Sequence, residues 1–345
     1  MFHFLKLRHL AAGIAAAALL SSSALAQFEE RSVRISIGVA DEHPQAVALK
    51  RFAEKLAELS DGKLKAKVFP NAALGDDANS TAALRAGTLE MNSTSTSPLT
   101  QLVPELAVFD FPFLFANYQE ADAVLDGPIG DEIGQKMAQK DLILLCWMEN
   151  GFRNLTNSQH AVEKADDVEG LKVRVMQNPV FLDAFGQLGS NPVAMAFSEV
   201  YPALESGAID AQENPNVTIL TSKFYEVQDY LAQTRHVYTP FMTLVSKTFW
   251  DKLSADEQKA MREACHDARD FQRQLTRQKD AEALEQLKEE GMEVTEISAE
   301  QRAAMQKKVQ PTIDRFSQQI GPDFVKRVYA EIEKVRGQGG QAKAQ

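Results

Sequence analysis

Two alternating hydrophobic periods, of two residues and of 3.6 residues, restrict the fold of this sequence more than any other feature. Residues 33–39 place apolar side chains at every second position, which predicts a strand, and residues 49–59 place them on one face of a helix. Asp61-Gly62 ends that helix, and residues 64–69 alternate again. This strand–helix–strand order is typical of parallel or mixed sheets in α/β proteins.

The alternation continues along the chain. We expect helices at 77–86 and 117–138 and strands at 88–92, 106–110, 141–147 and 170–176. Asn178-Pro179 then begins a helix, with asparagine as N-cap and proline at the first helical position. The sequence therefore predicts an α/β protein.

The C-terminal third has a different character. Ser254-Ala255-Asp256-Glu257 has the pattern of a capping box, and neither glycine nor proline interrupts residues 252–290. We expect one helix there, of a length typical of a strut between two lobes. A second capping box at 298–301 begins another helix, and the Gly/Gln/Ala-rich residues 337–345 are expected to be disordered.

The first 26 residues have the layout of a secretory signal peptide. Lys6 and Arg8 precede an apolar run at residues 10–20, and small residues stand at positions −3 and −1 before Gln27. The run is too short to span a bilayer, and no cysteine follows it that could carry a lipid anchor. We therefore expect cleavage after Ala26 and an exported mature chain.

The composition restricts both the class of protein and its partners. An apolar content of 44% and a charged content of 25% are globular values and exclude global disorder. The net charge is −11, and removal of Lys6 and Arg8 with the leader lowers it by two, to −13. Nucleic acids and anionic membrane surfaces are poor partners for such a chain. An anionic ligand would need a local positive site.

The sequence contains two cysteines, Cys146 and Cys265. They lie in an apolar strand-like run and a polar helix-like run, respectively. We expect two buried free thiols, with a disulfide as the alternative in an oxidising compartment. No Cys/His spacing fits a zinc site.

Two segments 120 residues apart resemble each other. Residues 83–92 and 203–212 share the frame Ala-Leu-x-x-Gly-x-(Leu/Ile)-acid-x-amide. Each copy predicts a helix end, a glycine stop and a short strand that leads into a polar loop, at 93–97 and 213–216. Two related lobes that present these loops to one cleft would explain the repeat, with chance or a common turn motif as the alternative. Open α/β sheets bind ligands at the carboxyl ends of their strands.

Two arginines in unusual places stand out, whereas no dinucleotide, phosphate-loop, zinc-protease or serine-hydrolase motif is present. Arg174 lies opposite the apolar face of strand 170–176, just before a helix start whose free N–H groups also suit a carboxylate. Arg153 follows the apolar strand at 141–147. The alternatives are a solvated surface arginine for Arg174 and a salt bridge to Glu149 for Arg153.

Several segments occur in the order of a known family. They are Leu74–Asp77, Glu149–Arg153, Leu171–Val175, Met195–Tyr201, Gln212–Pro215 and Lys223–Val227. Together they closely resemble the DctP family, the periplasmic solute-binding proteins of TRAP (tripartite ATP-independent periplasmic) transporters, over nearly the whole mature chain. The resemblance implies an α/β, two-lobed periplasmic binding protein fold with hinge strands and a long helix spanning both lobes. It also implies a periplasmic location, a small organic acid as ligand, integral-membrane permease subunits as partners, no enzymatic activity and no cofactor.

From this resemblance we place the lobes on the sequence. We expect lobe I at 27–151 and 240–279, lobe II at 152–239 and 280–310, a C-terminal helix at 311–336 and a disordered tail at 337–345.

The resemblance also implies roles for individual side chains. Arg174 resembles the family arginine that pairs with the ligand carboxylate, and Asn214 the asparagine that donates to the same carboxylate; the alternative for Asn214 is a turn residue before proline. Arg153 resembles a second basic residue of many members. Phe197 resembles the aromatic residue that packs on the ligand, with a core position as the alternative. Gln177 stands where some members have a ligand-contacting amide, and an ordinary strand-end residue is the alternative.

One departure from the family pattern concerns the loop after strand 88–92. Sialic-acid-binding relatives have an acidic residue and, three positions later, an arginine where this chain has Ser95 and Pro98. Sialic acid is therefore not the expected ligand. Ser95 and Thr96 instead offer hydroxyl donors in a tighter pocket, and a plain Ser/Thr loop is the alternative.

Three further residues complete the expected site. His43, in a His-Pro pair like that of dicarboxylate-type members, would donate to a distal carboxylate or cap a helix. Trp147 and Tyr238 would line the pocket or pack in the core. Glu213 is an unusual neighbour for an anion, and we expect it to orient backbone or an arginine.

We expect a four-carbon dicarboxylate such as succinate, fumarate or malate as the ligand. Two arginines with hydroxyl and amide donors suit two carboxylates on a short spacer, one held by Arg174 and the other by Arg153. Another organic acid, such as a 2-keto acid, lactate or a sugar acid, is the alternative ligand. A ligand-sensing co-receptor is the alternative function.

Overall fold

The computed structural model describes residues 28–342 and is built around one nine-stranded sheet. The strand order is β2-β1-β3-β8-β4-β7-β5-β6, with β9 beside β8. The strands are β1 Arg31–Ile37, β2 Leu64–Phe69, β3 Met91–Ser95, β4 Leu142–Asn157, β5 Lys172–Val175, β6 Asn191–Ala194, β7 Ala211–Asn214, β8 Tyr230–Ser246 and β9 Glu293–Glu296.

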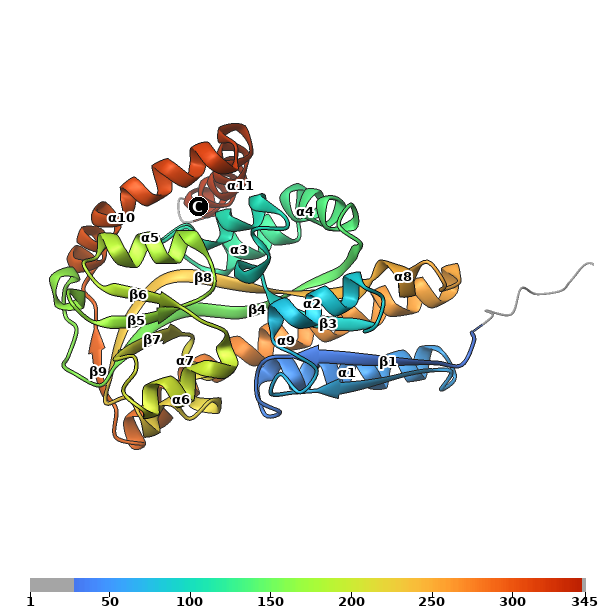
Figure 1. The fold of residues 1–345 in the computed structure, drawn as a ribbon. Coiled ribbons are helices and arrows are strands. Elements are labelled where there is room, and N and C mark those ends of the chain that lie inside the picture. Colours follow the sequence, from blue (N-terminus) through green and yellow to red (C-terminus); the bar gives the residue numbers. More distant parts are fainter. Residues whose placement is uncertain (1–27, 343–345) are drawn as a thin grey trace, which may run out of the picture.

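Helices cover both faces of this sheet (Figure 1). They are α1 Pro44–Leu59, α2 Asp77–Arg85, α3 Tyr118–Leu125, α4 Pro128–Ala138, α5 Pro179–Gln187, α6 Val200–Glu205, α7 Asn216–Thr221, α8 Lys247–Trp250, α9 Ala255–Glu289, α10 Ala299–Ile320 and α11 Pro322–Ala342. Short 3₁₀ helices are η1 Ser97–Leu99, η2 Pro104–Asp110, η3 Ala165–Val168, η4 Phe197–Glu199 and η5 Phe224–Glu226. Among residues 28–342, no helix is long and apolar enough to cross a bilayer.

The sheet has two halves with the same strand pattern. In one half β1 pairs in parallel with β2 and β3, and β3 pairs antiparallel with the long strand β8. In the other half β5 pairs in parallel with β6 and β7, and β7 pairs antiparallel with the long strand β4. Strands β4 and β8 pair with each other and pass from one half into the other (Figure 1). The molecule thus has the expected α/β, two-lobed architecture.

The repeated sequence frame occupies the same place in both lobes. Helices α2 and α6 end just before Gly87 and Gly207, whose φ angles are +72° and +67°. The carbonyls of Ala83 and Ala203 then each accept from the two backbone N–H groups that follow the glycine. β3 and β7 begin at equivalent positions of the frame. The predicted helix end, glycine and strand are confirmed, although β3 begins at Met91 because the turn occupies the preceding residues.

Helix α9 spans both lobes, as expected. Its capping box is formed: the Glu257 N–H donates to the Ser254 hydroxyl at 3.2 Å, and the Ser254 N–H donates to the Glu257 carboxylate at 2.7 Å. At 1.5 Å per residue its 35 residues extend about 52 Å. The helix packs against α1 of one lobe and α7 of the other.

The cysteines are joined, so the expectation of two free thiols is wrong. Cys146 of β4 and Cys265 of α9 form a disulfide, with their Cα atoms 6.0 Å apart. Each local pattern indicates that its cysteine is buried. Only the packing of α9 against β4 brings the two Cα atoms within bonding distance.

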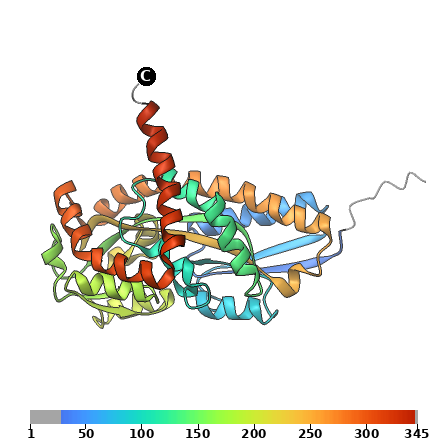
Figure 2. The same cartoon turned by 90° about the horizontal axis from the view of Figure 1, so that it is seen from above.

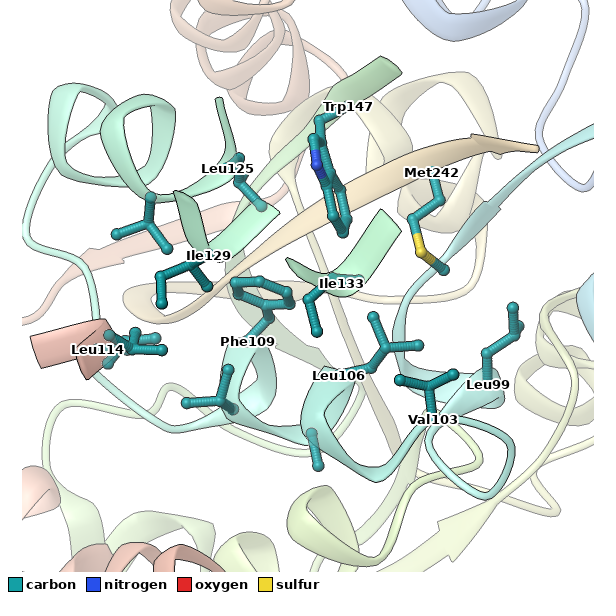
Figure 3. Close-up of a cluster of buried hydrophobic side chains, with 14 of the residues drawn as sticks. Leu99, Val103, Leu106, Phe109, Leu114, Leu125, Ile129, Ile133, Trp147 and Met242 are labelled. Atoms are coloured by element: carbon teal, nitrogen blue, oxygen red, sulfur yellow. The ribbon is translucent and has the colours of Figure 1, made fainter. Parts of the chain in front are cut away.

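Two predicted elements between residues 106 and 138 differ from the structure. Residues 104–110 form the 3₁₀ helix η2, not a strand: Pro104 lies in its first turn, and residues 106–110 are all buried in a core (Figure 3). A short, continuously buried apolar run does not distinguish a strand from a helical turn by its period. In this core Phe109 contacts Trp147 edge to face, with ring centroids 5.6 Å apart. The predicted helix at 117–138 is two helices, because Pro128 begins α4 at its first position.

The C-terminal helices also differ from the prediction. Helix α10 continues through Pro311 to Ile320, and Gly321, with a φ of +118°, separates it from α11. α11 projects from the lobes and continues to Ala342, where the sequence predicts disorder from 337 (Figure 2). The predicted signal peptide, 1–26, and residues 343–345 lie outside the described residues.

Candidate functional site

A cavity of about 40 Å³ lies at the carboxyl ends of the parallel strands, where the lobes meet. Residues that follow β1 and belong to β3 line it from one lobe: Gly38, Val39, Ser93 and Ser95. Residues at the ends of β5, β6 and β7 line it from the other: Met176, Gln177, Met195 and Asn214. The polar segments of the repeated frame therefore meet at one site.

The structure brings six of the predicted site residues together and leaves four out. The lining of the cavity includes Arg153, Arg174, Gln177, Phe197, Asn214 and Ser95. It does not include His43, Thr96, Trp147 or Tyr238.

Arg174 is a buried cation without a carboxylate partner among residues 28–342. Its Nε and Nη2 donate to the carbonyl of Met195 at 3.1 and 2.8 Å, and its side chain forms no ion pair within this range. Burial lowers the pKa of Arg174 to about 10, so the guanidinium is still charged at neutral pH. A buried charge is stable only when it is paired or hydrogen-bonded. The guanidinium of Arg174 therefore has further N–H groups and an unpaired charge that an anion could use.

Arg153 is already neutralised by Glu213. Its Nη2 donates to Glu213 Oε1 at 2.8 Å, and its Nε donates to Oε2 of the same carboxylate. His236 Nε2 lies 3.1 Å from that second oxygen. Burial opposes ionisation of Glu213, but Arg153 and His236 hold the pKa of Glu213 below its usual value.

The expectation that Glu213 orients an arginine fits this geometry. The alternative partner, Glu149, instead pairs with Arg277 of α9 at 2.8 Å. Arg153 therefore lines the cavity as half of a neutral ion pair.

Two acidic side chains at the start of α2 form another part of the lining. Asp76 caps the helix by accepting from the Asn79 N–H at 2.8 Å. Asp77 is deeper, and its Oδ2 accepts from the Ser95 N–H at 3.3 Å. Burial raises the pKa of Asp77 to about 6. Our site prediction missed both residues, because a Gly-Asp-Asp sequence before a helix is also an ordinary N-cap.

Gln45 adds an acceptor without a protein partner. Its Nε2 donates to Ser93 Oγ at 2.7 Å, whereas its buried Oε1 accepts from no group in the described chain. Asn150 and Thr218 also line the cavity and are joined by a 3.2 Å hydrogen bond. These polar residues were missed too, since a buried glutamine near a helix start has no distinctive sequence signal.

His43 and Thr96 lie behind the cavity wall. His43 caps α1: its Nδ1 accepts from the Gln45 N–H at 3.1 Å, and its Nε2 lies 3.2 Å from Thr218 Oγ1. Burial lowers the pKa of His43 to about 3, so the ring is neutral. His43 therefore caps a helix, which is the alternative role stated for it above. Thr96 is fully buried at the start of η1.

Trp147 and Tyr238 pack in the core, as their alternative stated. Trp147 lies against Phe109 in the cluster shown in Figure 3. Tyr238 contacts the rings of Phe115, Tyr118 and Phe152, and its hydroxyl donates to Glu149 at 3.3 Å.

Phe197 lies at the mouth of the cavity. It lines the cavity itself and also an outer groove that includes Tyr201 and Lys223. Its ring contacts Phe224 edge to face, with centroids 6.0 Å apart. An aromatic ring in this position can cover the carbon chain of a ligand.

Comparison with known proteins gives consistent matches over the length of the chain. Residues 35–319 match the family described as bacterial extracellular solute-binding protein, family 7, or DctP. The crystal structure of the sugar acid binding protein DctPAm from Advenella mimigardefordensis in complex with galactonate is 46% identical, with a TM-score of 0.88. That match covers 89% of this chain and 99% of the other.

Two curated relatives carry more specific names. The 2,3-diketo-L-gulonate-binding periplasmic protein YiaO of Escherichia coli is 36% identical over 281 residues, which are 81% of this chain and 85% of the relative. The C4-dicarboxylate-binding periplasmic protein DctP of Rhodobacter capsulatus is 31% identical over 326 residues, which are 94% and 98%. The chain therefore belongs to family 7 of the bacterial extracellular solute-binding proteins, the DctP family of TRAP-transporter receptors.

Proposed function

We propose that this protein is the periplasmic receptor of a TRAP transporter and binds a sugar acid, a monocarboxylate with several hydroxyl groups. It closes on the ligand between its lobes and delivers it, chemically unchanged, to the permease subunits in the membrane. Family membership and the periplasmic relatives support the transport role. The galactonate and diketogulonate of two relatives support the sugar-acid class, whereas the C4-dicarboxylate-binding relative supports the four-carbon dicarboxylate expected from the sequence.

The charge distribution of the cavity favours one of these two ligand classes over the other. Arg174 is the cation in the lining that lacks a counter-ion among the described residues, whereas Arg153 is paired with Glu213. Asp76 and Asp77 lie in the same lining. The cavity thus offers one position for a carboxylate and several acceptors.

A sugar acid uses both kinds of group. Arg174 and Asn214 hold its carboxylate by charge-assisted hydrogen bonds. Asp77 and the free Oε1 of Gln45 accept hydrogen bonds from its hydroxyl groups, and Phe197 covers its carbon chain. Buried acceptors that are left unpaired are costly, so these groups also select against a ligand without hydroxyl groups.

A dicarboxylate fits this charge pattern less well. Its second carboxylate would meet the acidic side chains of α2 and an arginine that Glu213 already neutralises. Like charges in a closed, poorly solvated site repel each other strongly. We therefore favour the sugar acid over the predicted succinate, fumarate or malate.

Calorimetric titration with D-galactonate and succinate tests the proposal. We expect the wild-type protein to bind D-galactonate at least about tenfold more tightly than succinate, the equivalent of about 1.4 kcal/mol. Asp77→Asn removes a hydroxyl-accepting charge and a repulsive charge together, so it should narrow or reverse that preference. Asp229→Asn, a change at an exposed position, is the matched control and should leave both affinities unchanged. Tighter wild-type binding of succinate would contradict the sugar-acid proposal.

A further inference from the structure

A chain of hydrogen-bonded polar side chains runs from the cavity into lobe II. Asn214 Nδ2 donates to Gln212 Oε1 at 2.6 Å, and Gln212 Nε2 donates to Thr156 Oγ1 at 2.8 Å. The Thr156 hydroxyl then donates to Gln228 Oε1 at 2.8 Å. All four residues are at most 3% exposed. We call these residues, Asn214, Gln212, Thr156 and Gln228, the amide relay.

The amide relay lies beside Arg174 in the sheet. Gln212 of β7 is the register partner of Thr156 on β4 and of Arg174 on β5. Its far end is anchored by main chain, because Gln228 Nε2 donates to the carbonyls of Val227 and Asp210 at 2.9 and 3.2 Å.

The anchor determines the direction of every hydrogen bond in the relay. Carbonyl oxygens only accept, so the amide nitrogen of Gln228 must face them and its oxygen must face Thr156. The single hydroxyl proton of Thr156 is used on that oxygen, so Thr156 can only accept from Gln212. Gln212 therefore turns its oxygen to Asn214, and Asn214 must present its nitrogen.

We infer that Gln212, Thr156 and Gln228 are positioning residues that fix the Asn214 amide with its nitrogen toward Gln212. The second N–H of that nitrogen has no acceptor within the described chain and is the donor for the ligand carboxylate beside Arg174. This inference rests on the proposed function, which places the carboxylate there. Without the relay, Asn214 could turn its oxygen toward the anion, which would repel it.

The relay carries a physical cost that a purely structural role does not require. Buried amides and hydroxyls lose hydration, and the loss is offset only when every group is hydrogen-bonded. Apolar side chains of the same size would fill this part of the sheet without that cost. Orientation of Asn214 is a function that only polar side chains in this order can provide.

Thr156→Val tests the relay because it removes the hydroxyl and keeps the shape. We expect its Kd for D-galactonate to rise by about tenfold, as one or two oriented hydrogen bonds are lost. Thr156→Ser keeps the hydroxyl and should remain within about threefold of the wild type. Ser246→Ala is the control: Ser246 is also a buried hydroxyl residue on a strand, but its hydroxyl has no partner among the described residues. It should leave the Kd unchanged.

A double-mutant cycle separates positioning from general destabilisation. In an Asn214→Ala background, Thr156→Val should change the Kd by less than about twofold, because the group that it positions is gone. A full tenfold loss in that background would overturn the inference, as would wild-type affinity of the single variant.

A measurement without ligand tests the relay even if D-galactonate is the wrong acid. The side-chain amide resonances of Asn214, assigned by their loss in Asn214→Ala, should shift in Thr156→Val and stay in place in Ser246→Ala. Unchanged resonances in Thr156→Val would overturn the inference. Failure of the wild-type protein to bind D-galactonate would instead contradict the proposed ligand. The Asn214 resonances in Thr156→Val would then decide alone whether the amide relay positions Asn214.

Discussion

At the scale of single residues, the two arginines of the site have opposite electrostatic roles. Both are buried and both line the cavity. Arg153 forms an ion pair with Glu213, so the pair adds no net charge to the cavity. Arg174 has only the carbonyl of Met195 as an acceptor within residues 28–342. The presence of a paired carboxylate, and not the residue type, decides which arginine can receive an anion.

Arg174→Ala should abolish ligand binding and leave the fold intact. The variant loses a charge-assisted pair in a closed cleft, a loss on the order of 2–5 kcal/mol. Arg174→Lys should restore little, because one ammonium group does not reproduce two parallel hydrogen bonds. Calorimetry gives the affinity, and Arg85→Ala, at an exposed position on α2, is the control. Near-native affinity in Arg174→Ala would remove this residue from the site.

Arg153→Met should damage folding more than ligand selection. It leaves the buried Glu213 without its arginine partner and with only His236 beside it, and loss of one partner of a buried ion pair typically costs about 3–5 kcal/mol. The double variant Arg153→Met/Glu213→Gln should recover much of this loss, and urea denaturation at pH 7 measures both. If Arg153 instead meets a second ligand carboxylate, as the sequence predicts, Arg153→Met would weaken succinate binding far more than butyrate binding.

Ligand affinity should depend on the ionisation of Asp77. Burial raises the pKa of this carboxyl to about 6. In the proposed complex a hydroxyl group of the ligand donates to its ionised form. Affinity for D-galactonate should therefore be full above pH 7 and fall as the pH drops through 6, by about tenfold at pH 5. The ligand carboxyl stays ionised over this range. Asp77→Asn should remove the pH dependence; an unchanged profile in that variant would contradict the assignment.

At the scale of elements, the disulfide joins a long strand of the sheet to the longest helix among the described residues. Cys146 lies on β4 and Cys265 on α9, and both elements extend through the two lobes. The bond closes a loop with a sequence separation of 119 residues. A cross-link restricts the unfolded chain more when the loop that it closes is longer, so this bond should contribute substantially to stability.

Replacement of both cysteines by serine should lower the free energy of unfolding by about 2–4 kcal/mol. Urea denaturation measures the change. A reducing agent should produce a similar loss in the wild-type protein and none in the double variant, which serves as the control. A wild-type midpoint that does not respond to reduction would argue against a stabilising disulfide.

At the scale of the whole molecule, we propose that the lobes turn about the middle of β4 and β8. β4 changes register between Glu149 and Gly151, opposite Pro240 and Thr239 of β8. Gln272 of α9 binds the backbone N–H and carbonyl of Glu149 at 2.9 and 2.5 Å, which fixes the helix to this point. The lobe boundaries at 151 and 239 stay a prediction from the sequence.

Ligand should close the lobes in solution. Asn214 and Arg174 belong to one side of the cavity and Asp77 and Ser95 to the other, so full contact requires both sides to approach. Small-angle scattering should show a smaller radius of gyration with saturating D-galactonate, as for other hinged binding proteins. Arg174→Ala should show no change at the same concentration. An identical radius for the wild-type protein with and without ligand would indicate a rigid site.

Much of this molecule was determined by local sequence pattern. The two periods, the capping box at Ser254 and the glycines of the repeated frame specify their elements because caps and turns depend on neighbouring residues only. Arg174 could be selected from its place on a strand face before a helix start. The family resemblance extended this information to Asn214 and Phe197.

Tertiary structure decided which of these groups act together. The partner of Arg153 is Glu213, 60 residues away, and the partner of Cys146 is Cys265, 119 residues away. Asp77 enters the cavity only because α2 packs beside β3, and Trp147 leaves it because η2 covers that ring. Charge compensation, burial and bonding depend on distances between segments that are remote in sequence. Those distances are set only when the chain has folded.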